Sequence, residues 1–167
     1  GALVRSVPED IQKLYEVGAP GRSAAEWAFR WLLDKPEFMT ILSGMSNIEQ
    51  ADDNLRIFDT AEAGCLSDAE KTTLENVRKA YEARIRVGCT GCQYCMPCPF
   101  GVDIPRNFRM MNDYAMYSNE RSLASSWKNM DEGARATACK KCGKCERACP
   151  QHLPIRQKLK QIAEKMG

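Results

Sequence analysis

The sequence CTGCQYCMPCP occupies residues 89–99, and the sequence CKKCGKCERACP occupies residues 139–150. Together they hold eight of the nine cysteines of this 167-residue chain. In both runs two residues separate the first three cysteines, and a proline follows the fourth. The second run has three residues before its last cysteine, whereas the first has only two. Cysteines this dense are typical of a metal-sulfur centre, so the two runs decide what the surrounding chain folds around.

The spacing favours two [4Fe-4S] clusters. A turn with two intervening residues aims three thiolates at three corners of a cubane, whereas the fourth corner faces away from that turn. The second run matches the bacterial ferredoxin pattern, in which the fourth cysteine ligates the other cluster. We therefore expect one cluster on Cys89, Cys92, Cys95 and Cys149, and the other on Cys139, Cys142, Cys145 and Cys98. Because the first run is shorter, local ligation by Cys98 in a distorted loop is the alternative.

Two other uses of cysteine compete with this interpretation. Structural zinc sites also use short cysteine spacings, so a zinc-stabilised helical interaction module without redox activity is the rival hypothesis. Zinc, however, gives no reason for the proline that follows the last cysteine of both runs. A disulfide framework is disfavoured because crowded C-x-x-C neighbours bridge poorly.

Composition and charge narrow the class of protein. Hydrophobic residues make up 44% of the chain, which is enough for a core, and no apolar run of eighteen residues predicts a membrane span. The net charge of +2 gives no argument for nucleic acid, and we expect a cytoplasmic protein. Locally, Lys140, Lys141, Lys144 and Arg147 surround the second run. They favour an acidic redox partner protein, with a solvated basic face as the alternative.

The chain before the cysteines predicts helices and one strand. Capping boxes begin at Ser23, Ser46 and Ser67, and the third predicts a helix that ends at Gly88. Its apolar stripe comprises Leu74, Val77, Tyr81 and Ile85. Residues 38–43, FMTILS, form the only convincing strand. One strand cannot form a sheet, so we expect the chain to be a fragment of a longer protein, with non-native self-association through this orphan strand.

Helices are also predicted around the cysteine runs. Pro105 suits the first turn of a helix with Phe108, Met111 and Ala115 on one face. A second helix is predicted with Leu123, Trp127 and Met130. Pro154 begins a terminal helix whose inward residues are Ile155, Leu159, Ile162 and Met166. This pattern predicts a helical two-cluster domain.

Two sets of residues resemble a known family. RSAAEWA at residues 22–28, TILSGMSN at residues 40–47 and Asp53-Asn54 resemble the last βα unit of an aldo/keto reductase barrel. The first cysteine run, GVDIP at residues 101–105 and CPQH at residues 149–152 resemble the ferredoxin-like extension of one branch of that family. The resemblance implies a mainly α chain: the last βα unit of a truncated (β/α)8 barrel, followed by an α-helical ferredoxin-like domain.

The resemblance also implies functions for both parts. The expected divisions are a barrel fragment at residues 1–62, a connecting helix at residues 63–87 and a two-cluster domain at residues 88–167. The family's catalytic residues lie on earlier strands, so none is expected here. The family's NAD(P)-contacting segment falls on Gly44, Met45, Ser46, Gln50, Asp53 and Asn54, with ordinary helix capping as the alternative. The chain would then be the electron-transfer end of an iron-sulfur oxidoreductase.

Overall fold

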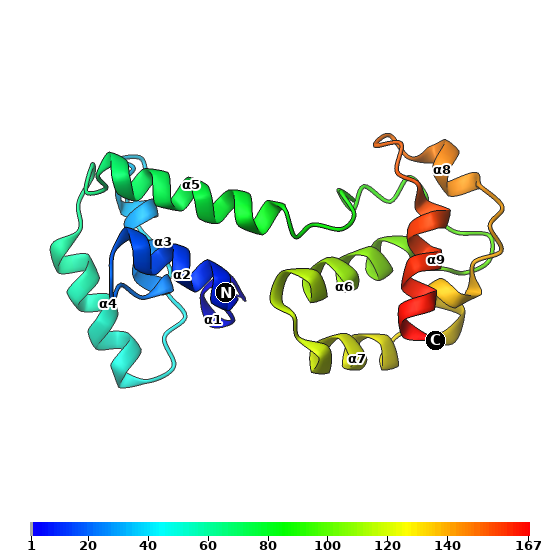
Figure 1. The fold of residues 1–167 in the computed structure, drawn as a ribbon, viewed down its shortest axis with the longest axis horizontal. Coiled ribbons are helices and arrows are strands. Elements are labelled where there is room, and N and C mark those ends of the chain that lie inside the picture. The colour runs from blue at the N-terminus through cyan, green and yellow to red at the C-terminus, as the bar shows by residue number, and fades with distance from the viewer. Residues whose placement is uncertain (1) are drawn as a thin grey trace. The chain divides into compact units, whose positions relative to one another are not determined.

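The computed structural model describes residues 2–167, which form two compact units divided between Glu82 and Ala83. All the regular elements of the described residues are helices, as Figure 1 shows. The predicted mainly α fold class is therefore confirmed. In the described part of the chain, no helix has the length and apolar character needed to cross a membrane.

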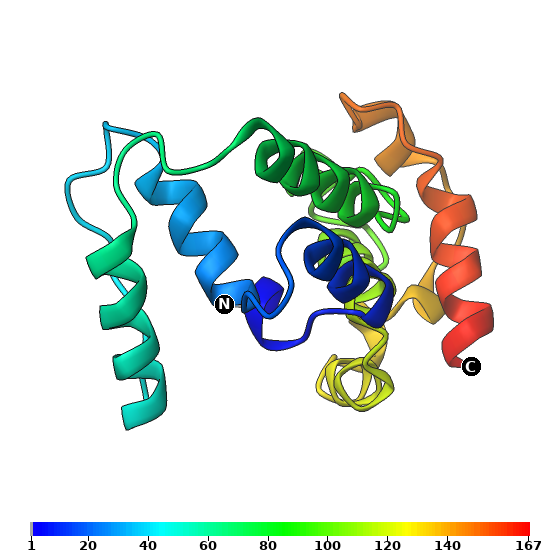
Figure 2. The same cartoon turned by 60° about the vertical axis from the view of Figure 1, so that its left-hand side comes forward.

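The first unit consists of five helices: α1 (Ala2–Arg5), α2 (Glu9–Gly18), α3 (Ala24–Leu33), α4 (Ile48–Thr60) and α5 (Asp68–Glu82). Helices α2 and α5 run side by side, and α3 packs near α4 (Figures 1 and 2). Trp27 on α3 is completely buried, stacks on Tyr15 of α2 with ring centroids 5.7 Å apart, and lies beneath the guanidinium of Arg22. This aromatic pair forms the centre of the unit's core.

Two carboxylates, Glu26 and Glu70, tie three helices of this unit together. Glu26 of α3 accepts hydrogen bonds from Arg30 of the same helix (2.7 Å) and from Arg56 of α4 (2.6 Å). Burial alone would raise the pKa of Glu26, but the bonds from Arg56 and Arg30 outweigh it and hold the pKa below its usual value. Arg22 pairs in turn with Glu70 of α5. Ionised carboxylates thus link α3 to α4 and the α3 entry to α5.

The capping box predicted at Ser67 is confirmed, and the Ser67 N–H donates back to the Glu70 carboxylate at 2.7 Å. At Ser23 only the serine cap is formed, because the Glu26 carboxylate bonds to Arg30 and Arg56 instead. The Ser23 hydroxyl accepts from the Glu26 N–H at 3.0 Å, and the Ser67 hydroxyl accepts from the Glu70 N–H at 3.3 Å. The prediction at Ser46 is wrong by one residue. There the Asn47 side chain caps α4, and the Gln50 side chain reaches back to the Ser46 N–H at 2.8 Å.

The predicted strand at residues 38–43 is wrong, since the described residues contain no strand. The segment between α3 and α4 is irregular, with Met39 96% and Leu42 93% exposed. A strand needs a neighbour to accept and donate its backbone hydrogen bonds, and the described chain supplies none. The β part of the implied βα unit is therefore not formed, whereas its helix, α4, is.

The helix predicted to run from Ser67 to Gly88 ends earlier, at Glu82. The Asn112 side chain accepts from the N–H groups of Arg86 and Val87, both at 3.0 Å, and donates to the Val87 carbonyl at 2.8 Å. These bonds hold the backbone in a non-helical path. Ile85, expected on the buried stripe, is 45% exposed.

The second unit contains α6 (Ile104–Tyr117), α7 (Glu120–Lys128), two 3₁₀ turns (Glu132–Ala134 and Ala136–Ala138), α8 (Lys144–Ala148) and α9 (Ile155–Met166). Its core joins α6, α7 and α9 around Phe108, Leu123 and Leu159. The face predicted for α6 is only partly right, because Phe108 is buried but Met111 and Ala115 are half-buried. Met130 is buried just beyond α7. The terminal helix buries Ile155, Leu159 and Ile162, as predicted.

Candidate metal centre

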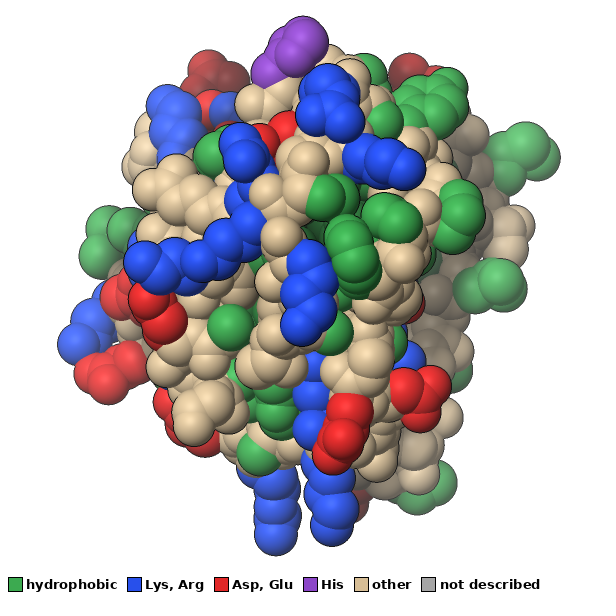
Figure 3. All heavy atoms as spheres, turned by 90° about the vertical axis from the view of Figure 1, so that its right-hand side faces the viewer, with side chains coloured by type: hydrophobic (Ala, Val, Ile, Leu, Met, Phe, Trp, Pro, Cys, Tyr) green, Lys and Arg blue, Asp and Glu red, His purple; other side chains and the backbone are tan. Residues whose placement is uncertain are grey.

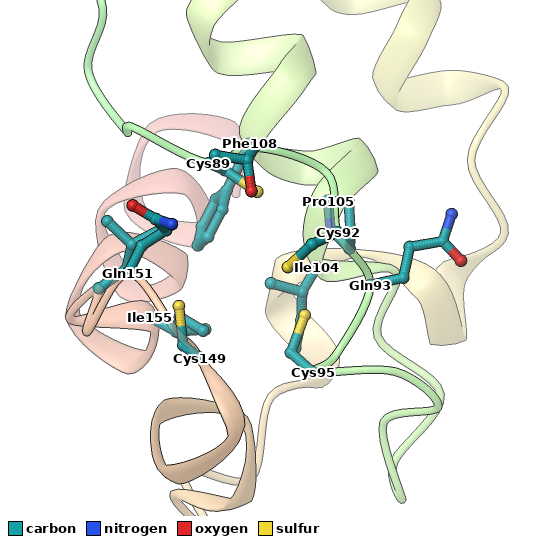
Figure 4. Close-up of a pocket in the computed structure, with 12 residues that line it drawn as sticks. Cys89, Cys92, Gln93, Cys95, Ile104, Pro105, Phe108, Cys149, Gln151 and Ile155 are labelled. Carbon is teal, nitrogen blue, oxygen red and sulfur yellow. The ribbon is translucent and has the colours of Figure 1, made fainter.

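The first pocket of the second unit is lined by four thiols. Cys89, Cys92 and Cys95 come from the loop before α6, and Cys149 comes from the turn between α8 and α9. Figure 4 shows the four sulfur atoms facing a common space, with Cys149 opposite the other three. Apolar side chains complete most of the lining, among them Ile104, Phe108 and Ile155. None of the lining residues is charged.

A second pocket holds the other predicted set of thiols. Cys139, Cys142 and Cys145 line it together with Cys98, while Cys95 borders both pockets. Unlike the first, this pocket is lined by cations: Lys140, Lys141, Lys144 and Arg156. The fourth cysteine of each run therefore lies with the first three of the other run. The structure brings together all eight predicted ligands, in two groups.

The two cysteine loops share one backbone conformation. The residue before the second cysteine of each run is left-handed, with φ of 70° at Gly91 and 55° at Lys141. The residue after that cysteine is left-handed too, with φ of 64° at Gln93 and 79° at Gly143. Left-handed residues in a turn point successive N–H groups into one concavity, the nest that many iron-sulfur sites use to bind anionic sulfur. Each loop is thus shaped to receive a negatively charged group.

The repeat continues through both Cys-Pro turns. The N–H of Gly101 donates to the Cys98 carbonyl at 3.0 Å, and the N–H of His152 donates to the Cys149 carbonyl at 3.1 Å. Both residues are left-handed, with φ of 83° and 51°. Helices α6 and α9 begin three residues later, at Ile104 and Ile155. The exposed His152 therefore occupies the position that glycine holds in the first half.

Asn107 fixes the approach to the second cysteine run. Its amide nitrogen donates to the carbonyls of Asp103 (2.7 Å) and Ala134 (2.9 Å), and its carbonyl oxygen accepts from the Ala136 N–H (3.0 Å). Asn107 is completely buried. Three residues after Ala136 the chain reaches Cys139, whose N–H donates to the Ala136 carbonyl at 3.2 Å. Asn107 therefore ties α6 to the segment that enters the second loop.

Asn107 and Asn112 were not singled out by sequence reasoning. Both are asparagines inside a helical apolar pattern, and nothing in the pattern distinguishes them from exposed polar residues such as Asn129. The sequence offers one weak indication of their role. Asparagine is a poor helix former, so two asparagines in one helix suggest that their side chains have a specific function. Asn112 positions the loop that leads to Cys89, as Asn107 does for Cys139.

The donor set of each pocket fits a [4Fe-4S] cluster. Burial, and then the neighbouring thiols, raise the pKa of the Cys95 thiol to about 11, and burial also raises the pKa of Cys145. Thiols with a raised pKa are protonated at neutral pH when no metal is bound, and the iron of a bound cluster would supply the positive charge that makes them thiolates. Among the described residues, no three His, Cys, Asp or Glu side chains converge on a point suited to one metal ion. The thiols surround a space instead, which suits a cage with four iron corners.

The six predicted nucleotide-contacting residues lie just before α4 and in its first half, and the polar side chains among them are engaged with neighbouring protein groups. The Ser46 N–H and hydroxyl both donate to the Gln50 side chain, and the Asn54 amide donates to the Ser43 hydroxyl at 2.8 Å. Asp53 pairs with Arg56 at 2.6 Å. Gly44 and Met45 lie in the irregular segment before the cap and are exposed.

The ninth cysteine, Cys65, lies outside both pockets, with its sulfur 3.7 Å from the Arg30 carbonyl.

Comparison with known proteins finds two family models that match different parts of the chain. Residues 5–79 match the model of the Aldo/keto reductase family, and residues 88–153 match that of the 4Fe-4S dicluster domain. Searches of curated proteins and of solved structures found no match. Both resemblances seen in the motifs are confirmed. The chain therefore joins a region that matches the Aldo/keto reductase family to one that matches the 4Fe-4S dicluster domain, and the two matches support an iron-sulfur electron-transfer portion of an oxidoreductase of that type.

Proposed function

We propose that the second unit carries single electrons through two [4Fe-4S] clusters, to or from a nicotinamide-dependent reductase site of the aldo/keto reductase type. Bound clusters would supply reversible one-electron chemistry. The observation that carries the proposal is the crossing of the fourth cysteines. Cys149 lines the pocket of Cys89, Cys92 and Cys95, and Cys98 lines the pocket of the second run.

The residues around each pocket have distinct tasks in this proposal. The left-handed loop residues turn backbone N–H groups toward the ligand space, where they lower the cost of the anionic charge. Phe108, Ile104 and Ile155 exclude water from the first pocket. Cys95 lines both pockets, so its side chain and backbone would offer an electron a direct covalent route between two bound clusters.

The first unit supports a second part of the proposal, an NAD(P) contact at the start of α4. An α-helix N-terminus favours an anionic phosphate, and Gly44, Met45 and Ser46 lead into this one. Gln50, Asp53 and Asn54 would contact the nucleotide by exchanging their present partners for it. The exposed apolar side chains beside them, including Met39, Leu42 and Ile48, would be covered by other strands of a barrel. In their absence, contact between copies through this surface is expected.

The test is cluster analysis of anaerobically reconstituted protein. We expect about eight irons and eight sulfides per chain. Cys149→Ala and Cys98→Ala should each disturb one cluster and leave about four irons in the other, whereas Cys65→Ala, the matched control outside both pockets, should leave all of them. Electron paramagnetic resonance of the two ligand variants should show different surviving clusters.

The zinc module is the alternative outcome of the same experiment. Stoichiometric zinc in protein from iron-replete cells, with a colourless product after reconstitution, would refute the electron-transfer proposal. A result in which Cys98→Ala and Cys149→Ala abolish the same cluster would refute the crossing of ligands but retain the iron-sulfur chemistry.

A further inference from the structure

The two pockets differ in their electrostatic surroundings. No charged residue lines the pocket of Cys89, Cys92, Cys95 and Cys149. The other pocket is lined by Lys140, Lys141, Lys144 and Arg156, and by no acidic residue. Since the same unit builds both pockets from the same repeated motif, this asymmetry is not a requirement of cluster binding. Positive charge is therefore concentrated around the second pocket and not around the first.

Three of these cations are available to a partner. Arg156 is paired with Glu146 at 2.7 Å. Lys140, Lys141 and Lys144 are exposed, and within the described residues none of them forms an ion pair. Figure 3 shows Lys and Arg side chains spread among apolar side chains over this side of the molecule, with acidic side chains also in view, and the three lysines concentrate positive charge around the second pocket. Such a concentration of one charge attracts an oppositely charged protein over long range.

Exposed aromatic side chains lie beside the cations. Tyr94, between Cys92 and Cys95, is 70% exposed, and Phe100, after the Cys98-Pro99 turn, is 45% exposed. Both line the cationic pocket. Protein interfaces commonly combine a small apolar centre, rich in tyrosine, with a polar rim that excludes water. Tyr94 and Phe100 supply such a centre, and the three lysines supply a rim of one sign.

We propose that this cationic face, defined by Tyr94, Phe100, Lys140, Lys141 and Lys144, is the docking site for an acidic one-electron carrier protein. The inference rests on the proposed electron-transfer function and adds the exit point and the partner's chemistry. The partner presents carboxylates around an apolar spot close to its own flavin or iron-sulfur group. One electron crosses the face, so that one protein is oxidised by one electron and the other reduced by one, without a bond or proton being exchanged.

The experiment measures binding of cluster-loaded chain to a flavodoxin of strongly negative net charge, with basic cytochrome c as the opposite probe. Iron and sulfide content are checked first for every variant, so that loss of clusters, which would count against the proposed function, is recognised separately. The flavodoxin should bind tightly at low ionic strength and about tenfold or more weakly at high ionic strength. Cytochrome c should bind weakly throughout.

Two charge-matched variants locate the site. Lys140→Glu/Lys144→Glu should weaken flavodoxin binding by about tenfold or more and make binding insensitive to salt. Arg121→Glu/Lys128→Glu makes the same change in net charge on exposed residues of α7, outside the cationic face, and should change the affinity less than about twofold. Lys141 is left unchanged because its left-handed backbone donates to the Cys139 sulfur at 3.4 Å.

A third variant separates the apolar centre from the charges. Tyr94→Ala should weaken flavodoxin binding at both low and high ionic strength while its salt dependence stays as in the unaltered chain. The docking proposal is overturned if cytochrome c binds as tightly as flavodoxin. It is equally overturned if the α7 variant loses as much affinity as Lys140→Glu/Lys144→Glu with clusters intact in both.

Discussion

Asn107→Ala is expected to loosen the second cysteine loop while leaving every ligand in place. The substitution removes three hydrogen bonds, to Asp103, Ala134 and Ala136, and leaves the buried Ala136 N–H without its partner. A net hydrogen bond contributes about 1 kcal/mol, and an unsatisfied buried donor costs about 1–3 kcal/mol. Because the amide is fully buried, water cannot replace these bonds. Two lost bonds at about 1 kcal/mol each and the orphaned Ala136 donor at about 1–3 kcal/mol give a cost of about 3–5 kcal/mol in total.

The readout is the rate at which cluster absorbance disappears in guanidinium under anaerobic conditions. Unfolding of a cluster protein is not a reversible two-state equilibrium, so a rate is the appropriate quantity. If the three bonds are already lost in the unfolding transition state, about 3–5 kcal/mol corresponds to about 10²–10⁴-fold faster bleaching. The matched control is Asn129→Ala, which removes an exposed amide whose only side-chain contact in the described residues is a 3.4 Å bond to Ser125.

Asn129→Ala should bleach at nearly the rate of the unaltered protein. Equal bleaching rates for Asn107→Ala and Asn129→Ala would refute the reasoning, since burial is the main difference between the two amides. Iron content measured before denaturation distinguishes loosening of a formed cluster from failure to assemble one.

Three further predictions follow from local structure. His152→Gly should slow cluster bleaching, by the equivalent of about 1 kcal/mol, because a left-handed backbone is costly for histidine. Gly101→Ala should speed bleaching, since its added Cβ would lie 3.3 Å from the Gly133 carbonyl oxygen. A change in the same direction for both variants would contradict the turn repeat. Trp27→Ala should destabilise the first unit by about 3–5 kcal/mol in thermal melts followed by circular dichroism, and a change below 1 kcal/mol would disprove its central place in the core. Burial would raise the pKa of Glu70, but bonds from Ser67 and Arg22 lower it to about 2, so its stabilising contribution is complete above about pH 4.5 and lost as pH falls toward 2. Glu70→Gln should flatten that acid dependence of the melting temperature, and an unchanged pH profile would exclude Glu70 as its source.

The repeated cysteine motif explains several irregularities of the second unit together. Each half consists of a loop with two left-handed residues, a Cys-Pro turn with a third, and a helix that begins three residues further on. Glycine fills some of these left-handed positions, while Gln93, Lys141 and His152 fill the others. The left-handed conformation at these positions is imposed by the loop as a whole, because the surrounding hydrogen bonds hold the backbone there whether the residue is glycine or not.

Local signals made much of the chain predictable. The cysteine spacing indicated both ligand loops, and Ser23 and Ser67 cap helices at the positions where capping boxes were predicted. The apolar stripe of α9 also follows from its helical periodicity, since Ile155, Leu159 and Ile162 recur on one face. In each case residues within a few positions of one another determine the outcome, and so their order in the sequence is sufficient.

Other features depend on residues that are distant along the chain. Residues 38–43 have strand-forming side chains, but a strand exists only when another backbone lies beside it. Helix α5 ends at Glu82 instead of Gly88, where the chain beyond it is held by Asn112, 25 residues after Val87. The role of Asn107 in holding the segment before the second cysteine run likewise depends on α6 lying beside Ala134 and Ala136, which are 27 and 29 residues away in the sequence. The periodicity of apolar residues in one segment does not indicate which distant residues will pack against that segment after folding.

The sequence by itself determined the chemistry of this protein: eight cysteines in two runs, each spaced to aim three thiols at one point. Only the tertiary structure distinguishes the predicted crossing from local ligation by Cys98, because it places Cys149 in the pocket of the first three cysteines and Cys98 in the pocket of the second run. The physical reason is that a loop can direct thiols over a few residues, whereas the fourth thiol of each pocket comes from chain that returns after some 50 residues.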